Sequence, residues 1–216
     1  MVRVFIGFDP REAAAYHTCV QSIIDTAKDP LQLSFTPVTG PMRDGSNAFI
    51  YARFLVPHLC GYSGSAVFLD GDMIVRHPIE DLFALIRQDC GATVAKHDYK
   101  TKYPVKYLGN KNDDYPRKNW SSVVGWNCGF MANRILTPAY VAMQTGSHLH
   151  RFAWLSDPQI GDLPQEWNRL VLEQEVLPTD KLLHYTIGTP CFAEYADCDM
   201  AEEWHAAYRR ATTPGR

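Results

Sequence analysis

Short apolar runs alternate along this chain with segments of helical periodicity, and this alternation restricts its fold more than any other feature. The runs are rich in β-branched and aromatic residues, which is typical of buried strands. We expect strands over 2–8, 31–38, 66–69, 92–95, 123–132 and 182–187, and helices after the first strand, over 48–59, 79–87 and 201–210, and from Thr137-Pro138 onward. Strands that alternate with helices favour an α/β domain with a mainly parallel sheet, whose ligands collect at the carboxyl ends of the strands.

The first expected helix has a start signal in the sequence. Asp9 is placed to cap it, Pro10 suits its first position, and Glu12 stands where a capping box requires an acidic side chain. By contrast, residues 96–122 show no clear periodicity and contain six Lys, one Arg and four Tyr. A polar segment of that length is usually functional or mobile, so we expect it to act as a lid over a ligand site.

The composition excludes several classes of protein. With 21 basic and 24 acidic residues the net charge is −3, which argues against a protein that coats nucleic acid. No apolar run approaches the roughly 18 residues of a membrane span, and the N-terminal run lacks the longer apolar region of a signal peptide. The six cysteines are scattered with no CxxC pair, so we expect them to be reduced. We therefore expect one cytoplasmic domain over 1–216, with 211–216 as a frayed tail.

The strongest local signal is Asp70-Gly71-Asp72, which directly follows the apolar run over 66–69. Carboxylates are hard oxygen ligands that suit Mg²⁺ or Mn²⁺, and such ions are usually held by one or two carboxylates together with substrate phosphates. Gly71 allows a close approach of backbone or ligand. A solvated turn that happens to contain two Asp is the ordinary alternative, but the position at the end of a buried strand favours a metal site.

Other candidate residues are weaker when taken singly. His184, at the end of an expected strand, suits the nitrogen ligand of a metal otherwise bound by oxygen, although a core histidine is the commoner case. Asn127 is placed to present an amide to sugar hydroxyls, or else marks a strand bend beside Gly129. Arg53 would reach a phosphate, or would be an ordinary surface arginine, and Asp157 lies in a polar turn.

Together these segments resemble the GT-A glycosyltransferases, and most of all the retaining family eight, the bacterial lipopolysaccharide galactosyltransferase and glycogenin type. Tyr51-Ala52-Arg53-Phe54 resembles the family's Y-A-R-L stretch, and Phe68-Leu69-Asp70-Gly71-Asp72-Met73-Ile74-Val75 its Y-L-D-x-D-x-L-V block. Trp126-Asn127-Cys128-Gly129 resembles F-N-A-G, Leu163-Pro164 with Trp167-Asn168 resembles L-P-x-x-W-N, and His184-Tyr185 resembles the family's H-Y.

The resemblance implies a Rossmann-like GT-A domain that transfers a sugar, with retention, from a nucleoside diphosphate sugar to an acceptor hydroxyl on a glycan, glycolipid or other molecule. It implies Mn²⁺ or Mg²⁺ held by Asp70, Asp72 and His184, and catalytic roles for Asp157, Asn127 and Arg53. The donor contacts that it implies are Phe8, Asp9, Arg11, Arg53, Asp70, Gly71, Asp72 and Gly188.

The sequence departs from the family in two places. Arg11-Glu12 replaces the family's Asn-Tyr, so the Tyr that stacks on uracil is missing; a UDP-sugar is expected, but the base stays open. No Lys precedes Pro190, so the phosphate-binding Lys has to come from elsewhere. The lysines considered for that role are Lys96, Lys102, Lys106 and Lys118.

Three alternatives remain. A haloacid-dehalogenase-like phosphatase also places D-x-D after a strand, but usually after the first strand and with Thr or Val at the second position after it. A nucleotide-sugar-binding protein without turnover would keep the pocket and lose the reaction. A nucleotidyltransferase would need a Gly-rich phosphate loop after the first strand, and the Phe8-Asp9-Pro10-Arg11 turn has none.

Overall fold

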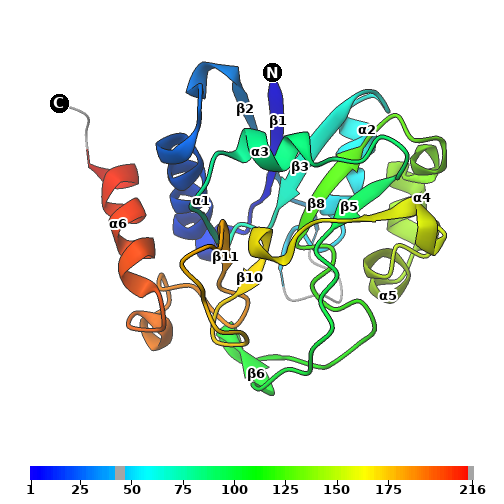
Figure 1. Ribbon diagram of the computed structural model, residues 1–216. Helices are drawn as coiled ribbons and strands as arrows, with labels where there is room; N and C mark the ends of the chain where they lie inside the picture. The colour runs from blue at the N-terminus through cyan, green and yellow to red at the C-terminus, as the bar shows by residue number, and fades with distance from the viewer. Residues whose placement is uncertain (42–46, 214–216) are drawn as a thin grey trace.

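The central element of the computed structural model, which describes residues 1–41 and 47–213, is a sheet of six strands in the order β2-β1-β3-β8-β5-β9 (Figure 1). All neighbouring strands are parallel except β8, which runs antiparallel to both β3 and β5. The mainly parallel α/β fold predicted from the sequence is confirmed. The strands are β1 Val2–Gly7, β2 Leu33–Val38, β3 Ser65–Leu69, β5 Ala92–Val94, β8 Val123–Asn127 and β9 Ile160–Asp162.

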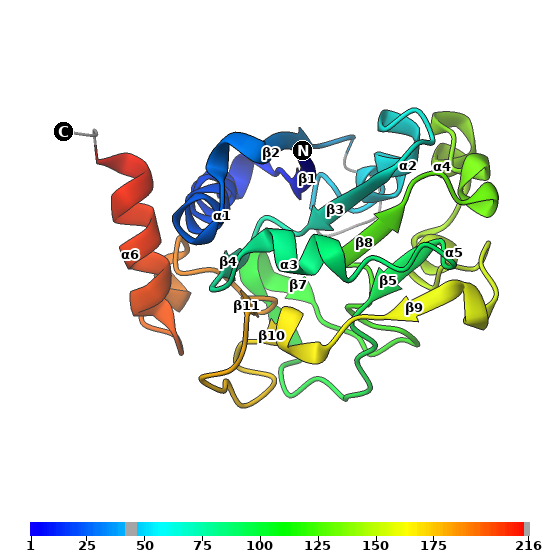
Figure 2. The ribbon, with the colours of Figure 1, turned by 45° about the horizontal axis from the view of Figure 1, so that its top comes forward.

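The two faces of this sheet are covered by different helices, as the alternation of side chains requires. In β1, Val4 and Ile6 point to the face covered by α1 (Ala13–Thr26) and α3 (Ile79–Ala84), whereas Phe5 points to the other face. That second face is covered by α2 (Val56–Leu59), α4 (Pro138–Met143) and α5 (Gly146–His150) (Figure 2).

A second, smaller sheet continues from the first. After β3 the chain turns through Asp70-Gly71-Asp72 into β4 (Met73–Val75), which pairs antiparallel with β11 (Leu182–His184). Parallel to β11 lies β10 (Arg169–Leu170), and α6 (Ala201–Thr212) packs beside α1 at this end of the molecule (Figure 1). Within the expected lid, β6 (Val105–Lys106) and β7 (Asn110–Lys111) form a short hairpin.

Several element boundaries differ from those expected. The helix expected over 48–59 is a 3₁₀ turn, Ala52–Leu55, followed by α2, because Pro57 has no N–H to continue an α-helix from the preceding turn. The strand expected over 123–132 ends at Asn127, and α6 continues to Thr212, two residues beyond its expected end. Residues 214–216 lie outside the described part.

The start of the first helix is only partly as predicted. Asp9 accepts a hydrogen bond from the backbone N–H of Arg11 at 2.9 Å and caps a 3₁₀ turn over Pro10–Glu12, which leads into α1. Glu12 forms no capping box: its side chain is buried and makes no cap hydrogen bond. None of the helices in the described part of the chain has the length and apolarity needed to cross a membrane.

Candidate active site

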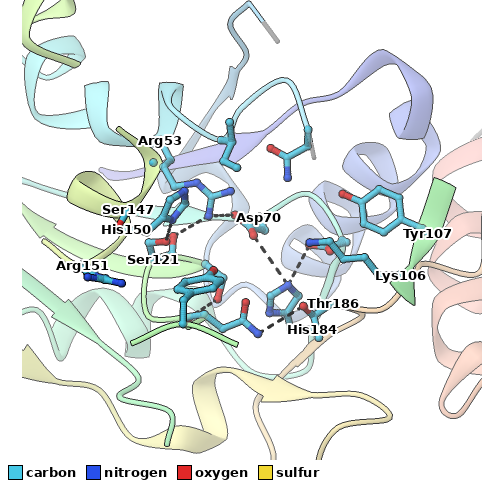
Figure 3. A pocket seen from close by; sticks show the side chains of 17 residues that line it. Arg53, Asp70, Lys106, Tyr107, Ser121, Ser147, His150, Arg151, His184 and Thr186 are labelled. Carbon is cyan, nitrogen blue, oxygen red and sulfur yellow. Dashed lines mark hydrogen bonds and ion pairs between the residues drawn. The ribbon is translucent and has the colours of Figure 1, made fainter. Parts of the chain in front are cut away.

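A cavity of about 420 Å³ opens at the carboxyl end of β3 (Figure 3). The β3–β4 turn contributes Asp70 and Asp72, and β11 contributes His184. The expected lid contributes Lys106, and α5 contributes His150 on the opposite side. The cavity is therefore built from segments far apart in the sequence, at the edge of the sheet where an α/β fold binds its ligands.

The β3–β4 turn is held rigidly in place. A Cβ atom on Gly71 would collide with the carbonyl oxygen of Gly7, so only glycine fits where the turn presses on the end of β1. The backbone N–H of Asp70 donates to the carbonyl oxygen of Ser122 at 2.9 Å, and that of Tyr185 donates to the carbonyl oxygen of Asp72 at 2.9 Å. These contacts fix the direction of both carboxylates.

Asp70, Asp72 and His184 form a buried cluster in which one ligand atom from each lies within 4.8 Å of the others. Nε2 of His184 is 3.3 Å from Oδ1 of Asp72 and 3.9 Å from Oδ2 of Asp70. Two carboxylates and one imidazole match the ligand preferences of a divalent ion such as Mn²⁺ or Mg²⁺. The three residues that the sequence pointed to are thus brought together in an arrangement that fits metal binding.

Asn168 sets the orientation of the His184 ring. Its side-chain nitrogen donates to Oγ of Ser122 at 2.9 Å, so its oxygen faces Nδ1 of His184, 3.1 Å away. With the ring proton on Nδ1, the lone pair of Nε2 would be available to a cation held by the two carboxylates. A hydrogen bond of this kind is the usual outer-shell support of a metal-binding histidine.

Arg53 forms an ion pair with Asp70. Its guanidinium lies 2.7 Å from Oδ1 of Asp70 and donates to the carbonyl oxygen of Ser121 at 3.0 Å. Burial raises the pKa of Asp70 to about 6; Arg53 opposes this shift, and repulsion from Asp72 adds to it. A carboxylate that is costly to ionise in the free protein, beside a second carboxylate, is a position where a bound cation gains much interaction energy.

Of the four lysines considered from the sequence, Lys106 is the one that lines the cavity (Figure 3). Burial lowers its pKa, while Asp72 and Asp70 act in the opposite direction. The hairpin that carries it is anchored because the N–H of Tyr107 donates to the carbonyl oxygen of Ile187 at 2.8 Å and the Tyr107 ring stacks on Phe192. A cation from the expected lid therefore shares the cavity with Asp70, Asp72 and His184.

The opposite wall of the cavity was missed from the sequence. Its buried polar centre is His150, whose Nδ1 lies 2.6 Å from Oγ of Ser121. The helix that carries His150 spans five residues, too few to show a helical period; the only signal was Thr145, which caps it by accepting from the N–H of His148 at 3.1 Å. Ser121 directly precedes Ser122 and β8, in a segment that the sequence placed only within the lid.

Two of the residues given a catalytic role by the resemblance do not line the cavity. Asn127 pairs with Ser65, at the start of β3, because β8 runs antiparallel to β3; its side chain lies at the far edge of the sheet and donates to the carbonyl oxygen of Gln88. The side chain of Asp157 is 84 % exposed and forms an ion pair with Arg117. Arg53 is the catalytic candidate that the structure does bring to the site.

Several residues that were expected to contact the donor make contacts within the protein instead. Both oxygens of the Asp9 carboxylate accept hydrogen bonds from Arg11, and one of them also accepts from the N–H of Ala48 at 3.0 Å. Phe8 packs edge-on against Tyr16, with ring centroids 5.5 Å apart. Gly188 lies close against the Tyr195 ring. None of Phe8, Asp9, Arg11 and Gly188 is among the described residues that line the cavity.

Comparison with known proteins gives one curated relative. Protein CDI of Arabidopsis thaliana is 38 % identical over 217 residues, which cover 94 % of this chain and 84 % of the relative. No family model matches the sequence.

Solved structures resemble the whole fold. The bifunctional glycosyltransferase WbbM, in its apo form, matches 99 % of this chain with a TM-score of 0.70 at 16 % identity, and this chain spans half the length of WbbM. The galactosyltransferase LgtC, solved with donor and acceptor sugar analogues, matches 100 % of this chain and 98 % of its own with a TM-score of 0.63 at 14 % identity. The glycosyltransferase GlyE of Streptococcus pneumoniae matches 96 % of this chain and 61 % of its own, with the same TM-score and identity.

Proposed function

The chain belongs to the family of Protein CDI and has the GT-A glycosyltransferase fold, and from this premise we propose that it transfers a sugar from a nucleoside diphosphate sugar to an acceptor hydroxyl, with a divalent metal and with retention of configuration. The observation that carries the proposal is the cluster of Asp70, Asp72 and His184, which shares one cavity with Arg53 and Lys106. This arrangement suits a diphosphate bound through a metal ion.

The positive charges around the cavity are opposite in sign to the charge that develops on the leaving group in the reaction. When the bond between the sugar and the diphosphate breaks, its electron pair passes to the phosphate oxygen, so negative charge develops on the leaving group. Arg53 and Lys106 are fixed cations placed to stabilise that charge. A divalent ion held by Asp70, Asp72 and His184 would supply further Lewis acidity at the same oxygen.

Retention is favoured by the groups that line the cavity. Among the described residues of its wall, Asp70 and Asp72 are the carboxylates, and both are assigned to metal binding. An inverting transfer needs a general base on the face of the sugar opposite to the leaving group. No carboxylate is left for that role, and burial lowers the pKa of His150, the histidine of the opposite wall, which makes it a weak base. The departing phosphate is therefore the base best placed to accept the proton of the acceptor hydroxyl, on the same face as the bond that breaks.

The donor to test first is a UDP-sugar with Mn²⁺ or Mg²⁺, and the acceptor is a hydroxyl of a glycan, a glycolipid or a small molecule. Metal-stripped protein is mixed with each sugar nucleotide and a panel of glycoside acceptors, with and without added Mn²⁺, and release of the nucleoside diphosphate is followed. We expect metal-dependent release, and a product whose anomeric proton in NMR shows the configuration of the donor.

The matched variants are Asp72→Asn and Asp197→Asn. Asp72 belongs to the metal-binding cluster, whereas Asp197 is an exposed carboxylate far along the chain from it. We expect only the first substitution to abolish metal-dependent release. Equal release by both variants, or hydrolysis of simple phosphate esters in place of sugar transfer, would contradict the proposed function.

A further inference from the structure

We propose that Ser121 and His150 form a sugar-binding wall that contacts the hydroxyl groups of the transferred sugar, and that this wall selects a neutral sugar with free hydroxyls. The inference rests on the proposed function, because it assigns one part of the same cavity. No part of the sequence pattern pointed to it, since the two residues lie 29 positions apart and on different elements.

The His150 ring is held in one orientation. It is 9 % exposed, and it packs edge-on against the Phe54 ring with centroids 5.2 Å apart. Nδ1 lies 2.6 Å from Oγ of Ser121, so this pair of atoms satisfies one side of the ring. Nε2 has no hydrogen-bond partner among the described residues, although His150 lines the cavity. A buried ring that leaves one nitrogen toward a cavity is arranged to bind a ligand there.

The position of the wall relative to the metal-binding cluster suggests which part of the donor it meets. The guanidinium of Arg53 bridges Oδ1 of Asp70, at 2.7 Å, and the carbonyl oxygen of Ser121, at 3.0 Å. The wall is therefore one side chain away from the expected diphosphate site. Lys106 lies on the other side of that site (Figure 3). The group attached directly to the diphosphate, which is the sugar, would lie against the wall, beside Arg53.

The chemistry of the wall fits hydroxyl groups. Burial, together with the nearby charges of Arg53 and Lys106, lowers the pKa of His150 well below its usual range, so the ring is uncharged at neutral pH. A neutral imidazole and a serine hydroxyl can each accept and donate hydrogen bonds, which is what a sugar hydroxyl requires. A site built to bond a hydroxyl discriminates strongly against an analogue that lacks it.

The test compares the affinity for the nucleotide alone with the affinity for the sugar nucleotide. Calorimetric titrations with UDP, UDP-glucose and UDP-galactose, each with Mn²⁺, give the ratio by which the sugar improves binding. His150→Asn places its amide near the position of Nδ1 and loses the atom that faces the cavity, whereas His150→Gln extends to the position of Nε2. His148→Asn is the control, because His148 lies on the same helix and bonds Tyr140 at 2.8 Å without lining the cavity.

In His150→Asn we expect the ratio of the affinity for the sugar nucleotide to the affinity for UDP, which we call the sugar-dependent gain, to fall by roughly three- to tenfold. This is the value of one net hydrogen bond, and the affinity for UDP itself should be unchanged. His150→Gln should retain part of the gain, and His148→Asn all of it. Ser121→Ala is the second variant should His150→Asn fail to fold, and it should lose part of the gain.

The possible failures can be told apart. If the folded variants at Ser121 and His150 keep the wild-type ratio, or raise only the KM for the acceptor, the sugar-binding wall is refuted while the proposed function stands. If the wild-type protein binds neither UDP nor its sugar conjugates in the presence of Mn²⁺, the proposed UDP-sugar donor is refuted and this inference with it.

Discussion

Replacement of Glu12 by Gln should stabilise the protein, and by an amount that grows with pH. Glu12 is 6 % exposed, and its Oε2 has no hydrogen-bond partner. Burial, followed by repulsion from Asp72, Asp9 and Asp70, raises its pKa from 4.5 to about 9. The folded chain therefore keeps the proton of Glu12 at pH values where the unfolded chain has released it.

The sign and size of the effect follow from this difference in pKa. Between pH 4.5 and about 9 the folded state binds more protons than the unfolded state, so the wild-type unfolding free energy falls as pH rises. The slope is about 1.4 kcal/mol per pH unit, which amounts to about 3 kcal/mol at pH 7. Gln has nearly the same size and does not titrate. The variant should thus match the wild type near pH 4.5 and exceed its stability by about 3 kcal/mol at pH 7.

The assay is urea unfolding of metal-free protein at pH 5, 6, 7 and 8, with the midpoint and the m-value measured for each variant. Glu175→Gln is the control, because Glu175 is an exposed glutamate. The quantity of interest is the difference between variant and wild type at each pH, which removes the contribution of the titrating groups that do not interact with Glu12. A difference that stays constant from pH 5 to 8 would show that Glu12 ionises normally in the folded state and would refute the reasoning.

Further predictions concern the metal-binding cluster, the hairpin and the core. Asp72→Asn should reduce turnover at saturating donor by at least roughly a hundredfold, measured as release of the nucleoside diphosphate; a rate near that of the wild type would exclude a catalytic metal at this position. Asn168→Ala removes the acceptor for Nδ1 of His184 and should weaken Mn²⁺ binding by about 10- to 100-fold in calorimetric titration, and unchanged affinity would mean that the ring is oriented by packing alone. Lys106→Met should weaken binding of UDP by about tenfold or more through the loss of a charge-assisted contact, and equal affinity would place the diphosphate elsewhere. Trp167→Ala deletes a side chain that is 0 % exposed and should lower the unfolding free energy by about 3 to 5 kcal/mol in urea titrations, and a loss below about 1 kcal/mol would show that the surrounding side chains collapse into the cavity.

The cluster of Asp70, Asp72 and His184, which fits metal binding, was predictable because its signals are local. A buried strand followed by Asp70-Gly71-Asp72 places two carboxylates at a sheet edge whatever the neighbouring strands are, since the turn must follow the strand. His184 lies within the apolar run expected as a strand over 182–187, and in the structure β11 ends at this residue. Here the structure joins the two ends through the antiparallel pairing of β4 with β11, in which His184 lies opposite Met73.

The sugar-binding wall and the candidates that do not line the cavity show where local signals stop. Asn127 lies at the carboxyl end of β8, and Asp70 directly follows the carboxyl end of β3. Because β8 is antiparallel to β3, the two residues lie at opposite edges of the sheet. Asp157 matches a family motif in sequence order, yet the chain there leaves its side chain exposed beside Arg117.

The sequence alone determined the class of fold, five of the six strands of the central sheet and the residues that fit a metal ion, because side-chain periodicity and the residues that follow a strand are properties of neighbours along the chain. The sixth strand of that sheet, β9, was not expected. Tertiary structure alone decided which lysine enters the cavity and which residues face the two carboxylates from the other side. Lys106 reaches the site through a hairpin anchored on Ile187, and His150 reaches it through Ser121. Strand direction and contacts over long separations arise from the packing of the whole chain, and no periodicity in the sequence encodes them.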